Sequence, residues 1–169
     1  MIQDYVQYNP SKIIFGHGAE EKTAQEIKRL GGTRVLLHYD AGAFIKPLIA
    51  RIRTQMEAAG LYVVELGGVV PNPLISLMKE GCRIVREDKL DFVLAVGGGS
   101  TMDSAKYIAC GAYYEGDLWN HPKFQPIATP VLKHGVVVTM PGTGSDVSTA
   151  AVWRDDSYSP ERKTCVFAD

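Results

Sequence analysis

The sequence has few cysteines, no excess of either charge and no long apolar run, and each of these shortages excludes a class of protein. Three cysteines in 169 residues, with no close pair, argue against a disulfide framework and against a CxxC metal or redox site. Lys and Arg number 18 against 19 Asp and Glu, so the net charge of -1 offers no footprint for nucleic acid or an anionic membrane. No apolar run approaches the roughly 18 residues of a membrane span, and the first residues lack a secretory signal pattern. We therefore expect a cytoplasmic protein.

Arrangements typical of hydrolytic or metal-dependent catalysis are also missing. The four histidines show no HxxxH or HxxH spacing and no clustered carboxylates, and they are His17, His38, His121 and His134. Each is interpreted as a surface residue or a satisfied core residue. The sequence contains no GxSxG elbow, and no cysteine follows a glycine turn into a helix. From these patterns we assign no catalytic residue and no metal ligand.

What the sequence does contain is a regular alternation of short β-branched runs and helical apolar patterns between residues 34 and 112, which predicts a parallel sheet flanked by helices. The predicted strands cover residues 35–39, 62–66 and 91–96, and the helices that follow them cover residues 45–59, 74–85 and 102–112, with Pro73 in a first turn. An earlier strand is expected at residues 13–15, before a helix around residues 24–30 that Gly31 and Gly32 end. After an irregular stretch beyond Glu115, strands are expected at residues 136–139, 149–154 and 163–167.

A glycine-rich segment lies where the buried strand at 91–96 meets the next helix, and it reads Gly97-Gly98-Gly99-Ser100-Thr101-Met102-Asp103. Glycines allow close approach of a ligand to the backbone, and a helix N-terminus offers unpaired N–H groups and a positive dipole end. The segment therefore predicts a pyrophosphate site, although a tight turn with an ordinary N-cap is the structural alternative. Asp103 is expected in the first helical turn, where the dipole stabilises a carboxylate. The segment matches neither a Walker loop nor the GxGxxG fingerprint.

A second glycine-rich turn, Thr139-Met140-Pro141-Gly142-Thr143-Gly144-Ser145-Asp146, also follows a predicted strand. Two such loops at the carboxyl ends of strands occupy the edge at which open α/β sheets bind ligands. Asp40, just past the strand at 35–39, is placed where an acid can bind both hydroxyls of an adenosine ribose, or it is an ordinary loop acid. Asn72 could instead cap the helix that follows it.

Taken in order, these segments together with Tyr8-Asn9-Pro10, Phe15-Gly16 and Pro71-Asn72-Pro73 resemble the N-terminal half of the iron-containing alcohol dehydrogenase family, especially its butanol-dehydrogenase-like branch. The resemblance covers nearly the whole chain. It implies an α/β fold with a Rossmann-like parallel sheet flanked by helices and a small β-hairpin near the C-terminus, as in a dehydroquinate synthase-like N-terminal domain. Residues 1–169 would then form one dinucleotide-binding domain.

The resemblance also implies contacts with a nicotinamide dinucleotide. The first glycine loop would hold the pyrophosphate, Asp40 and Asn72 would approach the adenosine end, and the second loop and its neighbours would line the rest of the groove. The implied cofactor-binding residues are Asp40, Asn72, Gly97, Gly98, Gly99, Ser100, Asp103, Thr139, Thr143, Ser148 and Lys163. An acid at position 40 favours NAD, whereas Gly42 keeps NADP open.

In this family a hydride moves between an alcohol carbon and the nicotinamide while a divalent metal, iron or zinc, polarises the substrate oxygen. The resemblance implies that the metal ligands, one aspartate and three histidines, come from a mostly helical C-terminal half, and Asp169 precedes the expected position of the first of them. We therefore expect this chain to be inactive by itself, with an alcohol or aldehyde as substrate of the full-length enzyme. A non-catalytic nucleotide- or phosphosugar-binding protein is the alternative, and a homodimer stays open.

Overall fold

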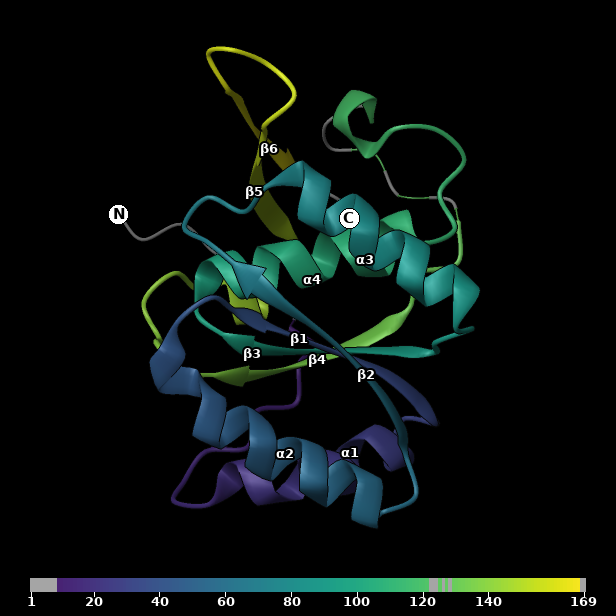
Figure 1. The fold of residues 1–169 in the computed structure, drawn as a ribbon, viewed down its shortest axis with the longest axis vertical. Coiled ribbons are helices and arrows are strands. Elements are labelled where there is room, and N and C mark those ends of the chain that lie inside the picture. The colour runs from purple at the N-terminus through teal and green to yellow at the C-terminus, as the bar shows by residue number, and fades with distance from the viewer. Residues whose placement is uncertain (1–8, 122–124, 126, 128, 168–169) are drawn as a thin grey trace, which may run out of the picture.

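The computed structural model describes residues 9–121, 125, 127 and 129–167, and its centre is a four-stranded parallel sheet. The strands are β1 (Arg34–Asp40), β2 (Tyr62–Val69), β3 (Phe92–Gly97) and β4 (Lys133–Val138), and they lie in the order β2-β1-β3-β4. Helices α1 (Thr23–Arg29) and α2 (Lys46–Ala58) cover one face, and α3 (Ile75–Glu87) and α4 (Gly99–Gly111) cover the other (Figure 1). The predicted Rossmann-like arrangement is confirmed.

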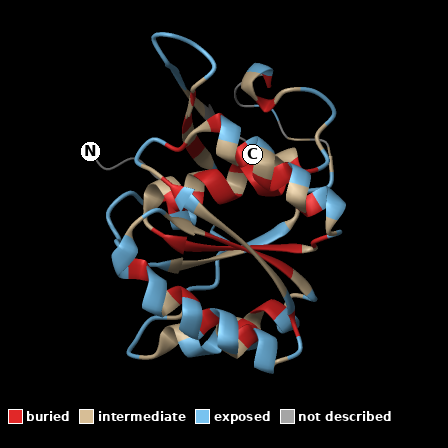
Figure 2. Ribbon diagram, in the orientation of Figure 1, coloured by how far each residue is buried: buried red, intermediate tan, exposed pale blue. Residues whose placement is uncertain are grey.

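The two inner strands, β1 and β3, form the core because both of their faces are covered by helices. Every residue of β3 is buried, and so is most of β1 (Figure 2). Side chains alternate between faces along a strand, so Val35 and Leu37 pack in the cluster with α1 and α2, while Leu36 packs with α3 and α4. The continuous apolar run of β3 is thus what a central parallel strand requires.

The strand order places a topological switch point, the position of the ligand crevice in open α/β sheets, at the carboxyl edge of this sheet. β1 has β2 on one side and β3 on the other, so the connections leave in opposite directions from the β1–β3 pair. Tyr39 pairs with Val96 and Gly97 pairs with Val138, which brings the chain segments after β1, β3 and β4 together at this edge. In open α/β sheets such a switch point is where ligands bind.

A separate antiparallel hairpin of β5 (Ala150–Asp155) and β6 (Arg162–Phe167) lies beside α4 and not in the main sheet (Figure 1). Trp153 of β5 meets Tyr107 of α4 edge to face, with ring centroids 5.0 Å apart. Four short 3-10 helices also occur among the described residues, at Ala19–Lys22, Ala43–Ile45, Leu118–Asn120 and Ser145–Val147. The small hairpin expected near the C-terminus is therefore confirmed.

The strand expected at residues 13–15 is wrong. This segment has no regular secondary structure, and the side chains of Ile13 and Phe15 are 69% and 99% exposed. Strand residues are stabilised by a hydrogen-bonded neighbour, and no strand of the described chain pairs with this one. Just before it, Ser11 Oγ and Asn9 Nδ2 donate instead to the carbonyls of Asp146 and Val147.

Three smaller expectations at element ends are also corrected. Pro73 lies outside α3, since Leu74 is the N-cap, and its carbonyl accepts a hydrogen bond from the Arg154 N–H at 3.0 Å. Asp40 is the last residue of β1 and does not lie beyond it. Asp103 is the fifth residue of α4, past the first turn, because the helix begins at Gly99 and not later. Propensity locates such ends poorly, since a turn of helix can form or fray with little change in free energy.

Among the described residues, no helix is both long and apolar enough to cross a membrane.

Candidate functional site

The first glycine loop forms the start of α4. Gly98 is the N-cap in an extended conformation, and its carbonyl accepts hydrogen bonds from the N–H groups of Thr101 at 3.0 Å and Met102 at 3.1 Å. The N–H groups of the first helical residues, Gly99 and Ser100, have no preceding helical turn to accept from them. Together with the positive end of the helix dipole, they can stabilise a bound anion.

The three glycines of this loop differ in whether the surrounding chain leaves room for a side chain. A Cβ added at Gly97 would lie 2.3 Å from Thr101 Oγ1, and one added at Gly99 would lie 2.6 Å from Thr143 Cγ2. At Gly98 the nearest atom would be Met140 Cβ at 3.7 Å, and φ is -93°, which any residue can adopt. Packing within the chain thus accounts for two of the glycines, whereas nothing in the described chain requires the third.

The second glycine-rich loop contacts the first directly. The Thr139 N–H donates to the Gly97 carbonyl at 3.0 Å, and Thr143 packs against Gly99. Gly144 adopts φ of 66°, a conformation that side chains disfavour, just before the short helix at Ser145–Val147. The structure therefore brings residues 97–100, Thr139 and Thr143 together at one edge of the sheet.

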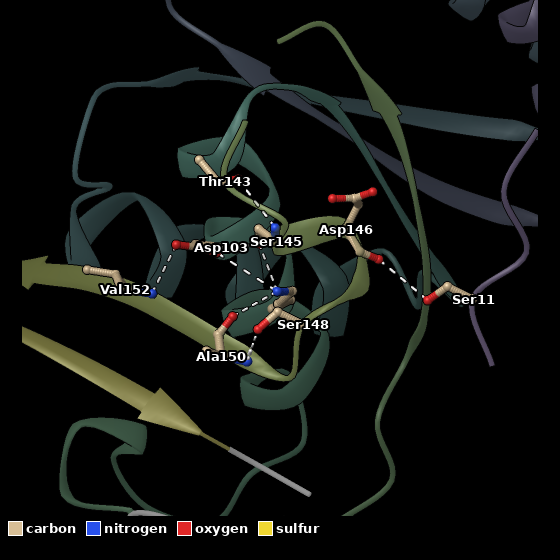
Figure 3. A network of polar contacts seen from close by, with 9 residues as sticks. Ser11, Asp103, Thr143, Ser145, Asp146, Ser148, Ala150 and Val152 are labelled. Carbon is tan, nitrogen blue, oxygen red and sulfur yellow. Dashed lines mark hydrogen bonds and ion pairs between the residues drawn. The ribbon is translucent and has the colours of Figure 1, made fainter. Parts of the chain in front are cut away.

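A polar network joins α4 to the chain that follows the second loop (Figure 3). The Ser145 hydroxyl donates to Asp103 Oδ1 at 2.6 Å, and the Val152 N–H donates to Asp103 Oδ2 at 3.0 Å. Lys106 Nζ donates to Ser145 Oγ and to the Ala150 carbonyl, both at 2.8 Å. The same nitrogen lies 3.9 Å from Asp103 Oδ1, so the two charges form a partly buried pair.

Burial and charge act in opposite directions on the lysine of this pair. Burial lowers the pKa of the Lys106 ammonium, and the nearby Asp103 carboxylate opposes that shift. The side chains of Lys106 and Asp103 are only 14% and 15% exposed. Water therefore solvates the two charges poorly, and the protein hydrogen bonds must compensate for that lost solvation. Both oxygens of Asp103 are engaged by protein groups, and a contact between Asp103 and the cofactor stays a prediction.

The two residues expected near an adenosine follow different strands of the sheet: Asp40 is the last residue of β1, and Asn72 lies in the loop after β2. Asp40 Oδ1 accepts a hydrogen bond from the Gly42 N–H at 2.8 Å, which turns the chain sharply after β1. Asn72 is exposed with φ of 53°, and its carbonyl accepts from Arg154 Nε at 3.2 Å. The alternative role of Asn72 as a cap is wrong, since α3 has Leu74 at its N-cap and no side-chain capping bond.

The remaining two expected residues lie farther along the chain. Ser148 is exposed and its Oγ accepts from the Ala150 N–H at 3.0 Å. Lys163 is exposed on β6 opposite Arg154, and within the described part of the chain no hydrogen bond joins its side chain to the glycine loops. Their grouping with the site stays a prediction.

Sequence reasoning assigned no role to Lys106, Ser145 or Ser104, although all three lie in or beside the glycine-rich motifs. The i, i+3 spacing of Asp103 and Lys106 on a helix was the available signal for an ion pair. Their partner Ser145 lies about 40 residues later in sequence, a separation that no local pattern reveals.

His38 lies on β1 beneath this edge and is fully buried, as expected for a satisfied core histidine. Its Nδ1 lies 2.7 Å from the Leu66 carbonyl and its Nε2 lies 2.7 Å from Ser104 Oγ on α4. Because a carbonyl can only accept, Nδ1 carries the proton and Nε2 accepts from the serine hydroxyl. Burial lowers the pKa of His38 to about 4, so the imidazole is neutral at pH 7.

In the part of the chain that the structure describes, neither a second pocket nor a group of metal-binding side chains adds to this site. A surface pocket of about 350 Å³ lies along α2, where Arg53 pairs with Glu57 and Glu65 and Tyr39 donates to Glu65, so these side chains already have partners. No group of three or more His, Cys, Asp or Glu side chains that could hold a metal ion occurs among the described residues.

Comparison with known proteins finds similarity along almost the entire chain. The family described as iron-containing alcohol dehydrogenase matches residues 10–168. The chain is 41% identical over 154 residues to a probable NADH-dependent butanol dehydrogenase 1 of Bacillus subtilis, covering 89% of this chain and 39% of that protein. It is 34% identical over 152 residues to an NADPH-dependent aldehyde reductase of Escherichia coli, covering 86% of this chain and 38% of that protein.

A solved structure gives the same result for the fold. The crystal structure of NADH-dependent butanol dehydrogenase A from Thermotoga maritima superposes with a TM-score of 0.87 at 34% identity, covering 99% of this chain and 42% of that one. The chain thus spans about two fifths of the length of the relatives that it matches.

Proposed function

Because the chain belongs to the iron-containing alcohol dehydrogenase family, we propose that its 169 residues form the nicotinamide-dinucleotide-binding domain of an enzyme that interconverts alcohols and aldehydes. The observation that carries this proposal is Gly98. Neither the backbone conformation of Gly98 nor its described neighbours require a glycine at this position. Gly98 also lies at the start of a helix, where anions bind favourably. A pyrophosphate pressed against the backbone at this position would account for the glycine.

In this proposal different residues around the crevice bind different parts of the dinucleotide. The N–H groups of Gly99 and Ser100 donate to phosphate oxygens, and Gly97 ends β3 so that the loop can turn toward them. Asp40 accepts from the ribose hydroxyls at the adenosine end, next to Asn72. Thr139, Thr143, Ser148 and Lys163 bind the half of the dinucleotide that lies beyond the pyrophosphate.

The dinucleotide supplies the hydride chemistry when it is bound. The described residues supply the binding surface, and they include no set of side chains that fits a divalent metal, so we derive no step through a metal ion. The iron or zinc of the proposed enzyme and its substrate contacts would come from outside this domain. The relatives named above are dehydrogenases and a reductase, which favours this proposal over a non-catalytic nucleotide- or phosphosugar-binding protein.

The first test is direct binding. Titration of the 169-residue chain with NADH and with NADPH, followed by nucleotide fluorescence, is expected to give saturable binding of at least one of them. The affinity is expected to be weak, because an isolated domain covers only one side of the ligand. Absence of saturable binding of both nucleotides at concentrations far above the protein concentration would contradict the proposal.

The preference between the two nucleotides is proposed to depend on Asp40. A carboxylate that accepts from the ribose hydroxyls repels a 2′-phosphate at the same position, so NAD is favoured slightly over NADP. Asp40→Gly is expected to raise the ratio of NADPH to NADH affinity by roughly tenfold, the effect of about 1.4 kcal/mol. Paired titrations of the variant and the wild type measure this ratio, with Asp88→Gly as a control at the opposite end of the strands. An unchanged ratio would place residue 40 away from the ribose.

A further inference from the structure

The second glycine loop depends on few contacts for its position. Between residues 139 and 149 every residue is exposed except Ser145, which is only 6% exposed. Loops with exposed residues and few buried contacts open at low free-energy cost. Ser11 and Asn9 donate to the carbonyls of Asp146 and Val147 through longer, exposed hydrogen bonds of 3.4 and 3.3 Å. The buried attachment of this loop is therefore made by the groups that hold Ser145.

Those groups are Asp103 and Lys106, about one turn apart on α4. Ser145 Oγ lies 2.6 Å from Asp103 Oδ1, as Figure 3 shows, and 2.8 Å from Lys106 Nζ, so one hydroxyl donates to the carboxylate and accepts from the ammonium. Lys106 also binds the Ala150 carbonyl, and Asp103 binds the Val152 N–H, which fixes the chain on the far side of the loop. The partly buried contacts of the loop and of the chain that follows it, here called the clamp, thus come from one helix, whereas Ser11 and Asn9 contribute only exposed hydrogen bonds.

The helix that provides this clamp is the same helix whose start carries Gly98. Asp103 is four residues beyond Gly99, and Thr143 packs against Gly99 from the second loop. The clamp therefore sets the spacing between the N-terminus of α4 on one side and Thr143 and Ser148 on the other. A lysine ammonium that is 14% exposed is costly to bury without partners, and here two acceptors and a carboxylate compensate for that cost.

We propose that Lys106, acting with Asp103, is a positioning residue for the dinucleotide: it holds Ser145 so that Thr143 and Ser148 face the half of the ligand beyond the pyrophosphate. The inference rests on the proposed function, because it concerns the same crevice. It predicts that loss of the lysine amine affects that half of the ligand selectively. ADP, which contains only the adenosine and phosphate part, is the probe for the other half.

The experiment compares the wild-type chain with Lys106→Met, whose side chain fills a similar volume without the amine. We expect the dissociation constant for NADH to rise roughly tenfold and that for ADP to change less than about twofold, since about one hydrogen-bonded contact is lost on one side only. Amide hydrogen exchange of residues 142–149 is expected to accelerate, while that of β3 stays unchanged. Lys133→Met is the matched control, because Lys133 Nζ also donates to a backbone carbonyl, that of Leu30, away from the crevice.

A second variant separates the clamp from a general loss of stability. If Lys106 acts through Ser145, then the double variant Lys106→Met with Ser145→Ala is expected to lose no more NADH affinity than the weaker-binding single variant. Additive losses would overturn the inference, and so would equal losses for NADH and ADP. Unchanged exchange of residues 142–149 in Lys106→Met would also overturn it, whatever the nucleotide data show. If the wild type binds neither NADH nor ADP, the proposed function fails and this inference fails with it, whereas normal wild-type binding with an unaffected Lys106→Met overturns the inference alone.

Discussion

Replacing Gly98 with valine is expected to weaken NADH binding about a hundredfold and to leave the melting temperature of the chain nearly unchanged. A Cβ at this position would meet no atom of the described chain closer than 3.7 Å, and the extended conformation of Gly98 suits a β-branched residue. The added methyl groups would occupy the space proposed for the pyrophosphate. Loss of charge-assisted hydrogen bonds worth roughly 2–3 kcal/mol corresponds to a hundredfold change.

The control variants make this prediction specific to one glycine. Gly99→Val is expected to lose both binding and stability, because a Cβ there would lie 2.6 Å from Thr143. Gly135→Ala on β4, where a Cβ would lie 3.4 Å from Phe92, is expected to bind NADH normally, as a control for adding a side chain to a glycine away from the proposed pyrophosphate site. Fluorescence titration gives the affinities and thermal unfolding gives the stabilities. Equal affinity of Gly98→Val and the wild type would show that the pyrophosphate lies elsewhere.

Acid is expected to destabilise the chain through His38, by about 3 kcal/mol between pH 6.5 and pH 4. The imidazole is fully buried and burial lowers its pKa to about 4, whereas the pKa of histidine in an unfolded chain is about 6.5. Below pH 6.5 the unfolded state therefore binds a proton that the folded state does not bind. The contribution to stability is complete above pH 6.5, is lost as the pH falls toward 4, and changes no further below that.

The measurement is the free energy of unfolding by urea at pH values from 7.5 to 4.5, for the wild type and for His38→Asn. The variant is less stable at pH 7 but lacks the titrating group, so its stability is expected to fall less steeply over this range. Carboxylates whose pKa is lowered, such as Asp91 and Asp156, act on both proteins and cancel in the difference. Parallel curves would contradict the prediction. If the variant does not fold, titration of the His38 imidazole by NMR decides the matter, because a midpoint near 6.5 in the folded chain would contradict it equally.

Those elements that have strong local signals were predicted correctly from the sequence. β3 and α4 were predicted because a continuous apolar run precedes a period of 3.6, and the end of α1 because Gly31 and Gly32 follow the last apolar position. Residues 13–15 have an equally strong β-branched run, but strand formation also needs a neighbour, and no local pattern shows whether one exists.

The candidate site was predicted in its backbone parts more than in its side-chain network. Glycine loops after strands are visible as composition, and the sheet order then brings them together. The network of Asp103, Lys106 and Ser145 joins residues about 40 positions apart, and their pairing depends on how the hairpin packs on α4. Because α4 begins at Gly99, Asp103 lies beyond the first turn of the helix and not within it, where it was expected. At this position its carboxylate accepts hydrogen bonds from Ser145 and from the Val152 N–H of β5.

The attachment of the β5–β6 hairpin to α4 has a mechanical consequence. Trp153 packs edge to face against Tyr107 of α4. Lys106 donates to the Ala150 carbonyl, and Asp103 accepts from the Val152 N–H. These contacts attach β5 to α4 through a ring contact and two backbone hydrogen bonds within about one turn of the helix. If α4 tilts on the sheet, the hairpin is therefore expected to move with it as one rigid unit. Lys163 on β6 and the N–H groups at the start of α4 would then keep their relative positions.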